Sequence, residues 1–325
     1  MRIFCIIKLG DDMVVRKFNY FRFFIFIVIL ASIIFGIVYF VKQNNYKNSY
    51  EYKLLQVGYS LEEANVLLSN YDNKMIDTLL ERKYNEHIIP LLSEKYFIYD
   101  KLDKYIEYRE KNKKKSYSEI VQIINVEMDI DWLDNQKETD VSKNELMLVN
   151  RIYGLSSDYV PSDLVDIPTK YAYSGKKISN SVLEQIIKLI DEAQMSGYTF
   201  VVSDGYRSYK EQENIYNSYA DFLGLSETDT FVARAGHSEY QTGLSFDLKP
   251  YNKVIEDVNS NEEHIWLKSN AHRFGFIFRF NAGQEHLTGF SKADWRLRYV
   301  GVDAATQIYN EGISFEEYYA YYVGE

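Results

Sequence analysis

The sequence has very little cysteine and fewer basic than acidic residues. Cys5 is the single cysteine of the 325 residues, so neither an intramolecular disulfide nor a cysteine-based zinc site can form within this chain. The chain has 37 lysines and arginines and 47 acidic residues, which gives a net charge of −10. Sequence-independent binding to nucleic acid needs a basic surface that displaces counterions from the phosphates. The composition therefore argues against nucleic acid as a partner, and any metal would need histidine and carboxylate ligands.

Residues 23–41 form a run of 19 uncharged residues, FFIFIVILASIIFGIVYFV. At 1.5 Å per residue, a helix of this length crosses about 30 Å of hydrocarbon. Five basic and two acidic residues precede the run, a flank of +3, and the far side begins with only Lys42 and Lys47. Because basic flanks stay in the cytosol, we expect a cytosolic tail (1–22), one transmembrane helix (23–41) in the cell membrane, and an extracellular remainder. A cleaved signal peptide is the alternative, but the run is long for one and no small-x-small site follows it.

Residues 42–145 are predicted to be a helical, membrane-proximal region. Apolar residues recur there at helical spacing. Two Ser-x-x-Glu capping boxes, which begin at Ser60 and Ser116, mark the starts of helices. Pro90 interrupts the pattern, so several short helices fit better than one rod. A purely structural or assembly role for this region is one of the functions left open.

Residues 146–325 are predicted to form an α+β domain. The boundary is placed near 145, after a change in composition. Beyond it, apolar spacing predicts a helix at 180–195, and β-branched and aromatic residues predict strands in TFVVSDG, at 244–248 and at 274–280. Helices and strands mix without a regular β-α-β alternation, which is typical of the α+β class.

Four stretches of this domain carry the functional information: SDGYRSYKEQ, ARAGHSEYQTGLSFD, WLKSNAHRFGFIFRFNAGQEHLTG and WRLRYVG, which begin at Ser203, Ala233, Trp266 and Trp295. Together they resemble the VanY-type zinc D-alanyl-D-alanine carboxypeptidases, over about residues 148–325. The resemblance implies a small antiparallel sheet with flanking helices. It also implies a role at peptidoglycan, whose stem peptides end in D-Ala-D-Ala.

The family's catalytic pattern is broken in this sequence. In the family, Ser-x-His-x6-Asp and a later Glu-Pro-Trp-His supply three zinc ligands and a glutamate base. Here the ligand positions are Tyr240, Asp247 and Arg296, and the base position is Ala293. Arginine has no acceptor and repels a dication, tyrosine is not a usual zinc ligand, and alanine cannot take a proton. The neighbouring Asp294 is a poor substitute because successive residues of a strand point opposite ways.

We therefore expect a pseudoenzyme of this peptidase family, with no catalytic residues, no zinc and no other cofactor. An active D-alanyl-D-alanine metallocarboxypeptidase is the alternative, and it would need a rearranged metal site. His237, Asp247 and His286 are the residues that could form such a site.

The residues that recognise substrate in the family remain. In the family, the arginine of the Gly-Tyr-Arg-Ser turn meets an oxygen of the D-Ala-D-Ala end, and a guanidinium fork suits two oxygens at once. Here the matching residues are Tyr206 and Arg207, with Gln212 in the same stretch and Ser238 in the position that hydrogen-bonds the peptide. We expect a stem peptide ending in D-Ala-D-Ala, or a cell-envelope protein, as the partner. The alternative is that Arg207 and Gln212 only brace the turn.

The loss of a metal next to Asp247 leaves a carboxylate that needs a partner. A buried, unpaired charge costs several kcal/mol. We expect the Arg296 guanidinium to pair with Asp247 in place of zinc, and the Tyr240 hydroxyl to donate to the same carboxylate. The alternative is that Arg296 turns to solvent and backbone amides alone hold Asp247.

Overall fold

The computed structural model describes residues 4–9, 12–17, 20–251 and 261–324. Contacts divide the chain into two compact units, Met1–Pro90 and Leu91–Glu325. The predicted tail, 1–22, lies partly outside the described residues. The boundary predicted near residue 145 comes from composition and stays a prediction.

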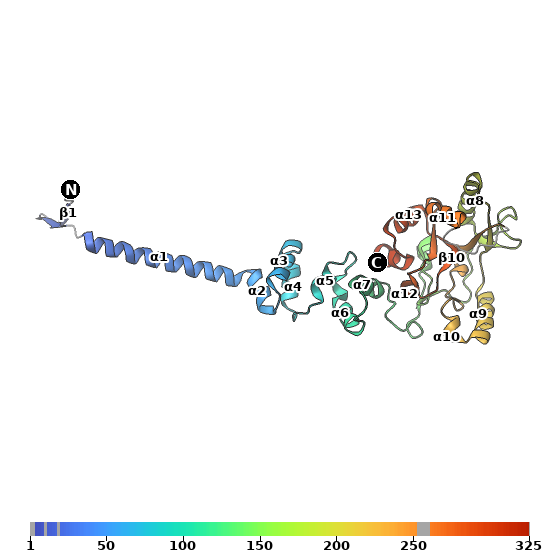
Figure 1. The fold of residues 1–325 in the computed structure, drawn as a ribbon, viewed down its shortest axis with the longest axis horizontal. Coiled ribbons are helices and arrows are strands. Elements are labelled where there is room, and N and C mark those ends of the chain that lie inside the picture. The colour runs from blue at the N-terminus through green and yellow to red at the C-terminus, as the bar shows by residue number, and fades with distance from the viewer. Residues whose placement is uncertain (1–3, 10–11, 18–19, 252–260, 325) are drawn as a thin grey trace. The chain divides into compact units, whose positions relative to one another are not determined.

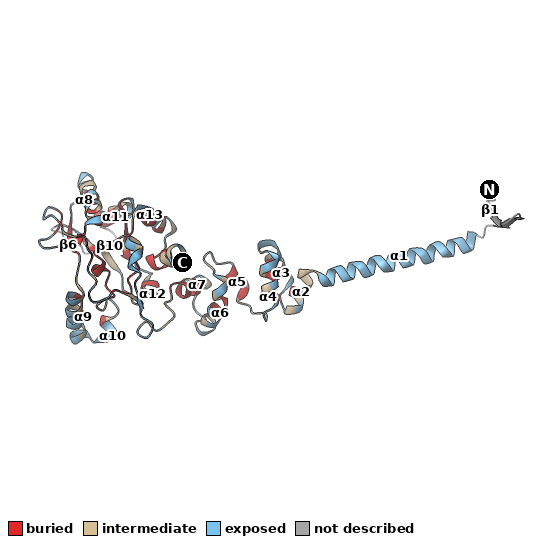
Figure 2. Cartoon of the chain, turned by 180° about the vertical axis from the view of Figure 1, so that it is seen from behind, coloured by how far each residue is buried: buried red, intermediate tan, exposed pale blue. Residues whose placement is uncertain are grey.

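The smaller unit contains two strands, one long apolar helix and a set of short helices. Its elements are β1 (Phe4–Leu9), β2 (Asp12–Lys17), α1 (Tyr20–Asn48), α2 (Tyr50–Val57), α3 (Leu61–Asn70) and α4 (Asn73–Leu80), and α5 (Ile88–Leu92) spans the division between the units. α1 includes the whole uncharged run, and none of its residues is buried (Figure 2). The helix is long and apolar enough to cross a membrane, although a signal sequence would meet the same test.

Polar side chains start the short helices, as the sequence predicts. The Ser60 hydroxyl accepts from the Glu63 N–H, and the Glu63 carboxylate accepts from the Ser60 N–H. The second predicted capping box, at Ser116, forms in the same way. Pro90 lies in a helix of only five residues. Several short helices, rather than one rod, are therefore confirmed.

The larger unit mixes short helices and short strands (Figure 1). Its helical segments are η1 (Tyr99–Lys101), α6 (Leu102–Lys111), α7 (Tyr117–Asn125), η2 (Val141–Leu146), α8 (Asn180–Met195), α9 (Tyr209–Leu223), α10 (Leu225–Thr228), η3 (Glu239–Thr242), α11 (Glu262–Asn270), η4 (Ala271–Phe274), α12 (Glu285–Thr288), α13 (Val302–Glu311), α14 (Phe315–Tyr318) and η5 (Tyr319–Val323). Its strands are β3 (Lys137–Glu138), β4 (Tyr153–Gly154), β5 (Leu164–Asp166), β6 (Lys177–Ser179), β7 (Phe200–Asp204), β8 (Ser245–Pro250), β9 (Phe276–Phe280) and β10 (Ala293–Tyr299). The α+β class and the helix at 180–195 are confirmed.

Four antiparallel strands form the central sheet, in the order β7, β8, β10, β9. Asp247 of β8 lies opposite Asp204 of β7 on one side and opposite Arg296 of β10 on the other. Residues that lie opposite each other in an antiparallel pair share one face of the sheet. The register therefore places these three charged side chains next to one another on one face.

The opposite face of the sheet packs into the hydrophobic core. Phe246 and Leu297 alternate with Asp247 and Arg296 along their strands, and they belong to the same core cluster as Ile186 of α8. Both views place α8, α11 and α13 on one side of β10, with α9 and α10 on the other (Figures 1 and 2). Packing against the core thus holds β8 and β10 in place, and the other face of these strands carries the charged residues.

The second half of the predicted helical region packs within the larger unit. Ile123 of α7 and Val126 cluster with Leu287 of α12. Tyr96 stacks on Tyr321, with ring centroids 4.0 Å apart. Offset and stacked aromatic pairs of this kind add stability beyond the area that they bury. Helices α6 and α7 are therefore part of the body that carries the sheet.

Candidate functional site

The turn between β7 and α9 carries the arginine predicted to recognise a ligand. Gly205 is needed in this turn because a Cβ there would lie 2.5 Å from a backbone carbonyl oxygen of β6. Ser208 caps α9 and fixes the start of the helix. The Arg207 guanidinium donates from Nη2 to Asp204 Oδ2 at 2.6 Å and from Nη1 to Gln212 Oε1 at 2.7 Å. Arg207 and Gln212 thus brace the turn, and their role in recognition stays a prediction.

Arg296 of β10 joins Asp247 to Tyr240. Its Nε donates to Asp247 Oδ1 at 3.0 Å, and its Nη2 donates to the Tyr240 hydroxyl at 2.5 Å. The predicted ion pair between Arg296 and Asp247 is therefore confirmed. The two side chains are 24% and 19% exposed, so water screens the pair only weakly. The Tyr240 ring also lies 4.3 Å from the guanidinium carbon of Arg296 and 4.3 Å from that of Arg207, distances typical of cation–π contacts.

The prediction for the Tyr240 hydroxyl is wrong. In the described part of the chain, this hydroxyl accepts from Arg296 and makes no hydrogen bond to Asp247. A guanidinium has donors and no acceptor, so the hydroxyl can meet Arg296 only by accepting. Burial raises the pKa of Tyr240 above its ordinary value, so the phenol stays neutral. Burial alone would lower the pKa of Arg296, but Tyr240 and Asp247 raise it, so the guanidinium stays charged.

The side chains at the family's three ligand positions do not suit zinc. Zinc in proteins takes thiolate, imidazole and carboxylate ligands. Asp247 is the one such group here, and Arg296 already contacts its carboxylate. A guanidinium offers five donors and no acceptor, and the neutral Tyr240 phenol is a poor replacement for an imidazole. The side chains at these three positions therefore suit an arginine cation as the partner of Asp247, and they do not suit a metal ion.

The family's base position offers no proton acceptor. Ala293 begins β10 and lines a cavity beside the charged cluster. The Asp294 carboxylate pairs with Lys292 at 3.2 Å, and Asp294 is not among the described residues that line the cavity. The expectation that Asp294 does not replace the missing glutamate stays a prediction.

The rearranged metal site is not assembled. His237 is buried, and its Nδ1 lies 2.8 Å from the Asn150 carbonyl oxygen. Burial lowers the pKa of His237, so the ring favours the neutral form. His286 lies in the short helix α12. Within the described ranges, no three His, Cys, Asp or Glu side chains form a group that could hold a metal ion, so His237, Asp247 and His286 are not brought together.

A cavity of about 230 Å³ opens beside the Arg296 cluster. Half of its lining residues are apolar and half are polar or charged, and the polar ones come from residues 237–239 and 291–296. The lining residues are Val149, Phe231, Ala233, His237, Ser238, Glu239, Phe280, Phe290, Ser291, Lys292, Ala293 and Arg296. Ser238 therefore lines the cavity, while Arg207, Tyr206 and Gln212 lie outside this lining. The role of Ser238 in binding stays a prediction.

A buried charge network next to the cavity is not predicted by the sequence analysis. Glu239 lies between Ser238 and Tyr240, and its carboxylate accepts from Arg279 Nε at 2.7 Å and from Arg298 Nη1 at 2.5 Å. Burial would raise the pKa of Glu239, but Arg298 and Arg279 lower it below its ordinary value. The feature of the sequence that indicates this network is the alternation of arginines with apolar residues in FIFRF and WRLRYV. The network fixes the turn that presents Ser238 and Tyr240.

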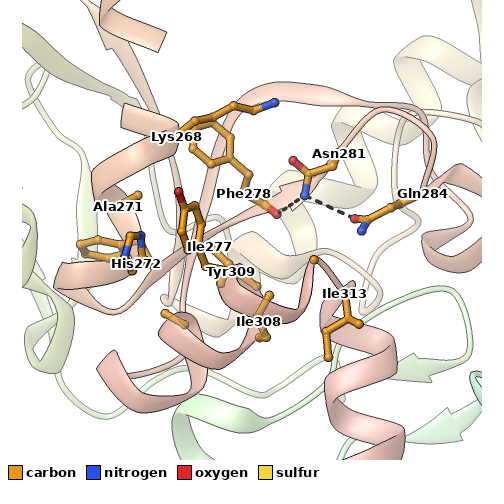
Figure 3. A pocket seen from close by; sticks show the side chains of 13 residues that line it. Lys268, Ala271, His272, Ile277, Phe278, Asn281, Gln284, Ile308, Tyr309 and Ile313 are labelled. Atoms are coloured by element: carbon orange, nitrogen blue, oxygen red, sulfur yellow. Dashed lines mark hydrogen bonds between the residues drawn. The ribbon is translucent and has the colours of Figure 1, made fainter. Parts of the chain in front are cut away.

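A second cavity of about 260 Å³ lies between α11, β9 and α13 (Figure 3). Its floor contains Ile277, Ile308 and Ile313, and the Asn281 amide donates to Gln284 Oε1 at its edge. None of the residues at the family's ligand, base or recognition positions lines this cavity. The candidate site is therefore the cavity beside Arg296.

Comparison with known proteins places the chain in a family. A family model described as D-alanyl-D-alanine carboxypeptidase (VanY) matches residues 175–302. YodJ of Bacillus subtilis (strain 168), a carboxypeptidase by name, is 32% identical over 59% of this chain and 72% of its own length. The D-alanyl-D-alanine carboxypeptidase of Enterococcus faecalis (strain ATCC 700802 / V583) is 31% identical over 56% of this chain and 68% of its own length.

Solved structures agree with the sequence relatives. The LD-carboxypeptidase LdcB, whose structure was used to explain peptidoglycan recognition, is 31% identical with a TM-score of 0.54, over 58% of this chain and 91% of LdcB. A VanY D,D-pentapeptidase solved in complex with Zn(II) is 32% identical over 54% of this chain and 98% of its own length, with a TM-score of 0.48. These matches include the sheet, the Arg207 turn and most of the cavity described above. The chain belongs to the VanY family of D-alanyl-D-alanine carboxypeptidases.

Proposed function

We propose that this chain is a membrane-anchored, outward-facing member of the VanY family that holds no zinc and cuts no peptide. It binds peptidoglycan stem peptides ending in D-Ala-D-Ala, or a cell-envelope protein, at the cavity beside Arg296. The observation that carries the proposal is the contact between the Arg296 guanidinium and Asp247, at 3.0 Å. That contact gives the aspartate at a family ligand position a permanent cation as its partner.

The missing base supports the same proposal independently of the metal. Peptide hydrolysis in this family needs a group that takes a proton from water. Ala293 cannot do so, and the Asp294 carboxylate is engaged by Lys292. A chain that recovered zinc alone would therefore still lack its base.

The remaining polar groups support binding. Ser238 lines the cavity, and Arg207 lies behind Tyr240, with its guanidinium carbon 4.3 Å from the ring. Polar groups that converge on a cavity beside apolar side chains can orient a small ligand. A site with recognition groups but without a metal or base is suited to binding its ligand without changing it.

The anchor is proposed from α1 and the charges around it. α1 is apolar along the uncharged run, and the +3 flank before that run favours a cytosolic N-terminus. The larger unit would then face the cell wall, where peptidoglycan lies.

Restoring the family's side chains should restore zinc. In the variant Tyr240→His, Arg296→His and Ala293→Glu, we expect about one zinc per chain, because two imidazoles and Asp247 complete a zinc site. Any one of these changes alone should bind none. Metal analysis of the full chain in detergent measures this, with Lys188→His combined with Lys210→His as a control that adds two exposed histidines elsewhere. A folded triple variant without zinc would contradict the account of the site.

The wild-type chain should bind a peptide ending in D-Ala-D-Ala and release no D-alanine. Calorimetry measures binding, and an enzymatic D-alanine assay measures release over hours. The D-alanyl-D-alanine carboxypeptidase of Enterococcus faecalis serves as the positive control for release. D-alanine release by the wild-type chain that a chelator abolishes would overturn the proposal and restore a metallopeptidase.

The orientation is tested on intact protoplasts that carry an N-terminal epitope tag on this chain. Added protease should digest the larger unit and leave a tagged fragment that ends near the outer end of α1. Digestion of the tag should require permeabilised cells. A larger unit that resists protease until permeabilisation, or a soluble chain cleaved after the apolar run, would rule out the proposed anchor.

A further inference from the structure

The lining of the cavity beside Arg296 includes two cationic side chains, Arg296 and Lys292. Its walls are mostly side chains without charge, such as Val149, Phe231 and Phe290. The charged groups in the lining are Glu239, Lys292 and Arg296. His237 also lines the cavity, and its imidazole favours the neutral form because burial lowers its pKa. Glu239 is fully engaged by two buried arginines, so it contributes no free negative charge to the cavity. Arg296 and Lys292 are in turn paired with Asp247 and Asp294, so what this lining offers an anionic group is the hydrogen-bond donors that these pairs leave unused.

Arg296 has donors to spare in this position. A guanidinium has five N–H donors, and Arg296 uses Nε for Asp247 and one N–H of Nη2 for Tyr240. Nη1 makes no hydrogen bond within the described part of the chain, and it is not among the buried polar atoms that lack a partner. Since Arg296 lines the cavity, a ligand there meets a side chain whose guanidinium has unused donors.

Arg207 is less well placed to meet a ligand in this cavity. Both of its Nη atoms already donate to protein side chains, to Gln212 and Asp204. Its Asp204 contact is shared with Lys176 Nζ, which lies 3.1 Å from that carboxylate. Arg207 does not line the cavity, and the Tyr240 ring lies against its guanidinium. The arginine with unused donors in the lining of the cavity is thus Arg296.

We propose that Arg296 has taken over ligand recognition at the vacated metal position, and that it binds the C-terminal carboxylate of a short peptide with small side chains. This inference rests on the proposed function, which it deepens by naming the group that is recognised and the residue that recognises it. In this proposal, Nη1 of Arg296 donates to the carboxylate of the peptide. Nε of Arg296 continues to donate to Asp247 and so balances its negative charge. Ser238 and Lys292 lie in the same lining and offer further donors.

The size of the cavity supports this class of ligand. About 230 Å³ is below the range of roughly 300–1,000 Å³ usual for drug-sized ligands. One or two small residues at a peptide C-terminus fit such a space, and the Ala293 methyl adds no bulk to the wall. A charge-assisted hydrogen bond from arginine is about twice as strong as a neutral one, so loss of the carboxylate charge should be felt strongly.

The test compares two probes on the full chain in detergent by calorimetry. They are diacetyl-L-lysyl-D-alanyl-D-alanine and the same peptide with a C-terminal amide, which differ only in the charge at the end. The wild-type chain should bind the acid at least tenfold more tightly than the amide. Arg296→Gln should reduce this ratio to about one, and Arg273→Gln, an exposed arginine outside the cavity, should leave it unchanged.

Two further variants keep the test decisive. Arg296→Gln combined with Asp247→Asn removes both members of the ion pair, so no lone charge is left if the single variant folds poorly, and the ratio should again be about one. Arg207→Gln should retain a ratio near that of the wild-type chain. A preference for the acid that survives loss of Arg296, or that disappears with Arg207 instead, would overturn this inference.

The inference and the proposed function fail in different ways. Equal binding of acid and amide by the wild-type chain would overturn the role of Arg296 but leave a ligand site without catalysis. Absence of binding to either probe would overturn this inference together with the peptide as ligand. Zinc-dependent D-alanine release would overturn the proposed function, whatever the ratio of affinities.

Discussion

The Asp247 carboxylate lies in a cleft where it is only 19% exposed, and a negative charge in that position needs a positive partner. The sheet register decides which partner is available, because Arg296 lies directly opposite Asp247 on the neighbouring antiparallel strand. A metal ion would satisfy the same carboxylate in a zinc enzyme. Here an arginine side chain does so, and Tyr240 completes its contacts. The character of the whole cavity follows from this exchange of a metal ion for a fixed guanidinium.

The frame that holds this cluster is itself charged and buried. Arg279 and Arg298 contact Glu239, and Arg279 also contacts Glu316 at 2.6 Å. Breaking a fully buried pair of this kind costs about 3–5 kcal/mol because one charge is left without compensation. Since Glu239 lies between Ser238 and Tyr240, the network sets the position of both. It also ties the turn at η3 to the C-terminal helix α14, which carries Glu316.

Much of this architecture could be predicted from the sequence. Apolar periodicity was enough for α8, and the Ser60 and Ser116 caps followed from local spacing alone. The strand predicted at 274–280 begins later, at residue 276, because Gly275 has a left-handed φ of 83° and ends the preceding turn. The ion pair between Arg296 and Asp247 could be predicted because both residues stand at ligand positions of the family's zinc site. The acceptor role of Tyr240 could not be predicted, since it depends on the direction of a hydrogen bond. The Glu239 network could not be predicted either, since it depends on the register between β9 and β10, which periodicity does not determine.

The central claim is that Arg296, and no metal ion, partners Asp247. Anomalous scattering at the zinc edge, from crystals of the full chain grown with zinc, tests it most directly. The account predicts no anomalous peak at coordination distance, about 2.0–2.2 Å, from the Asp247 oxygens, with Arg296 Nε still on that carboxylate. A zinc peak on Asp247, with the Arg296 side chain swung away, would contradict it.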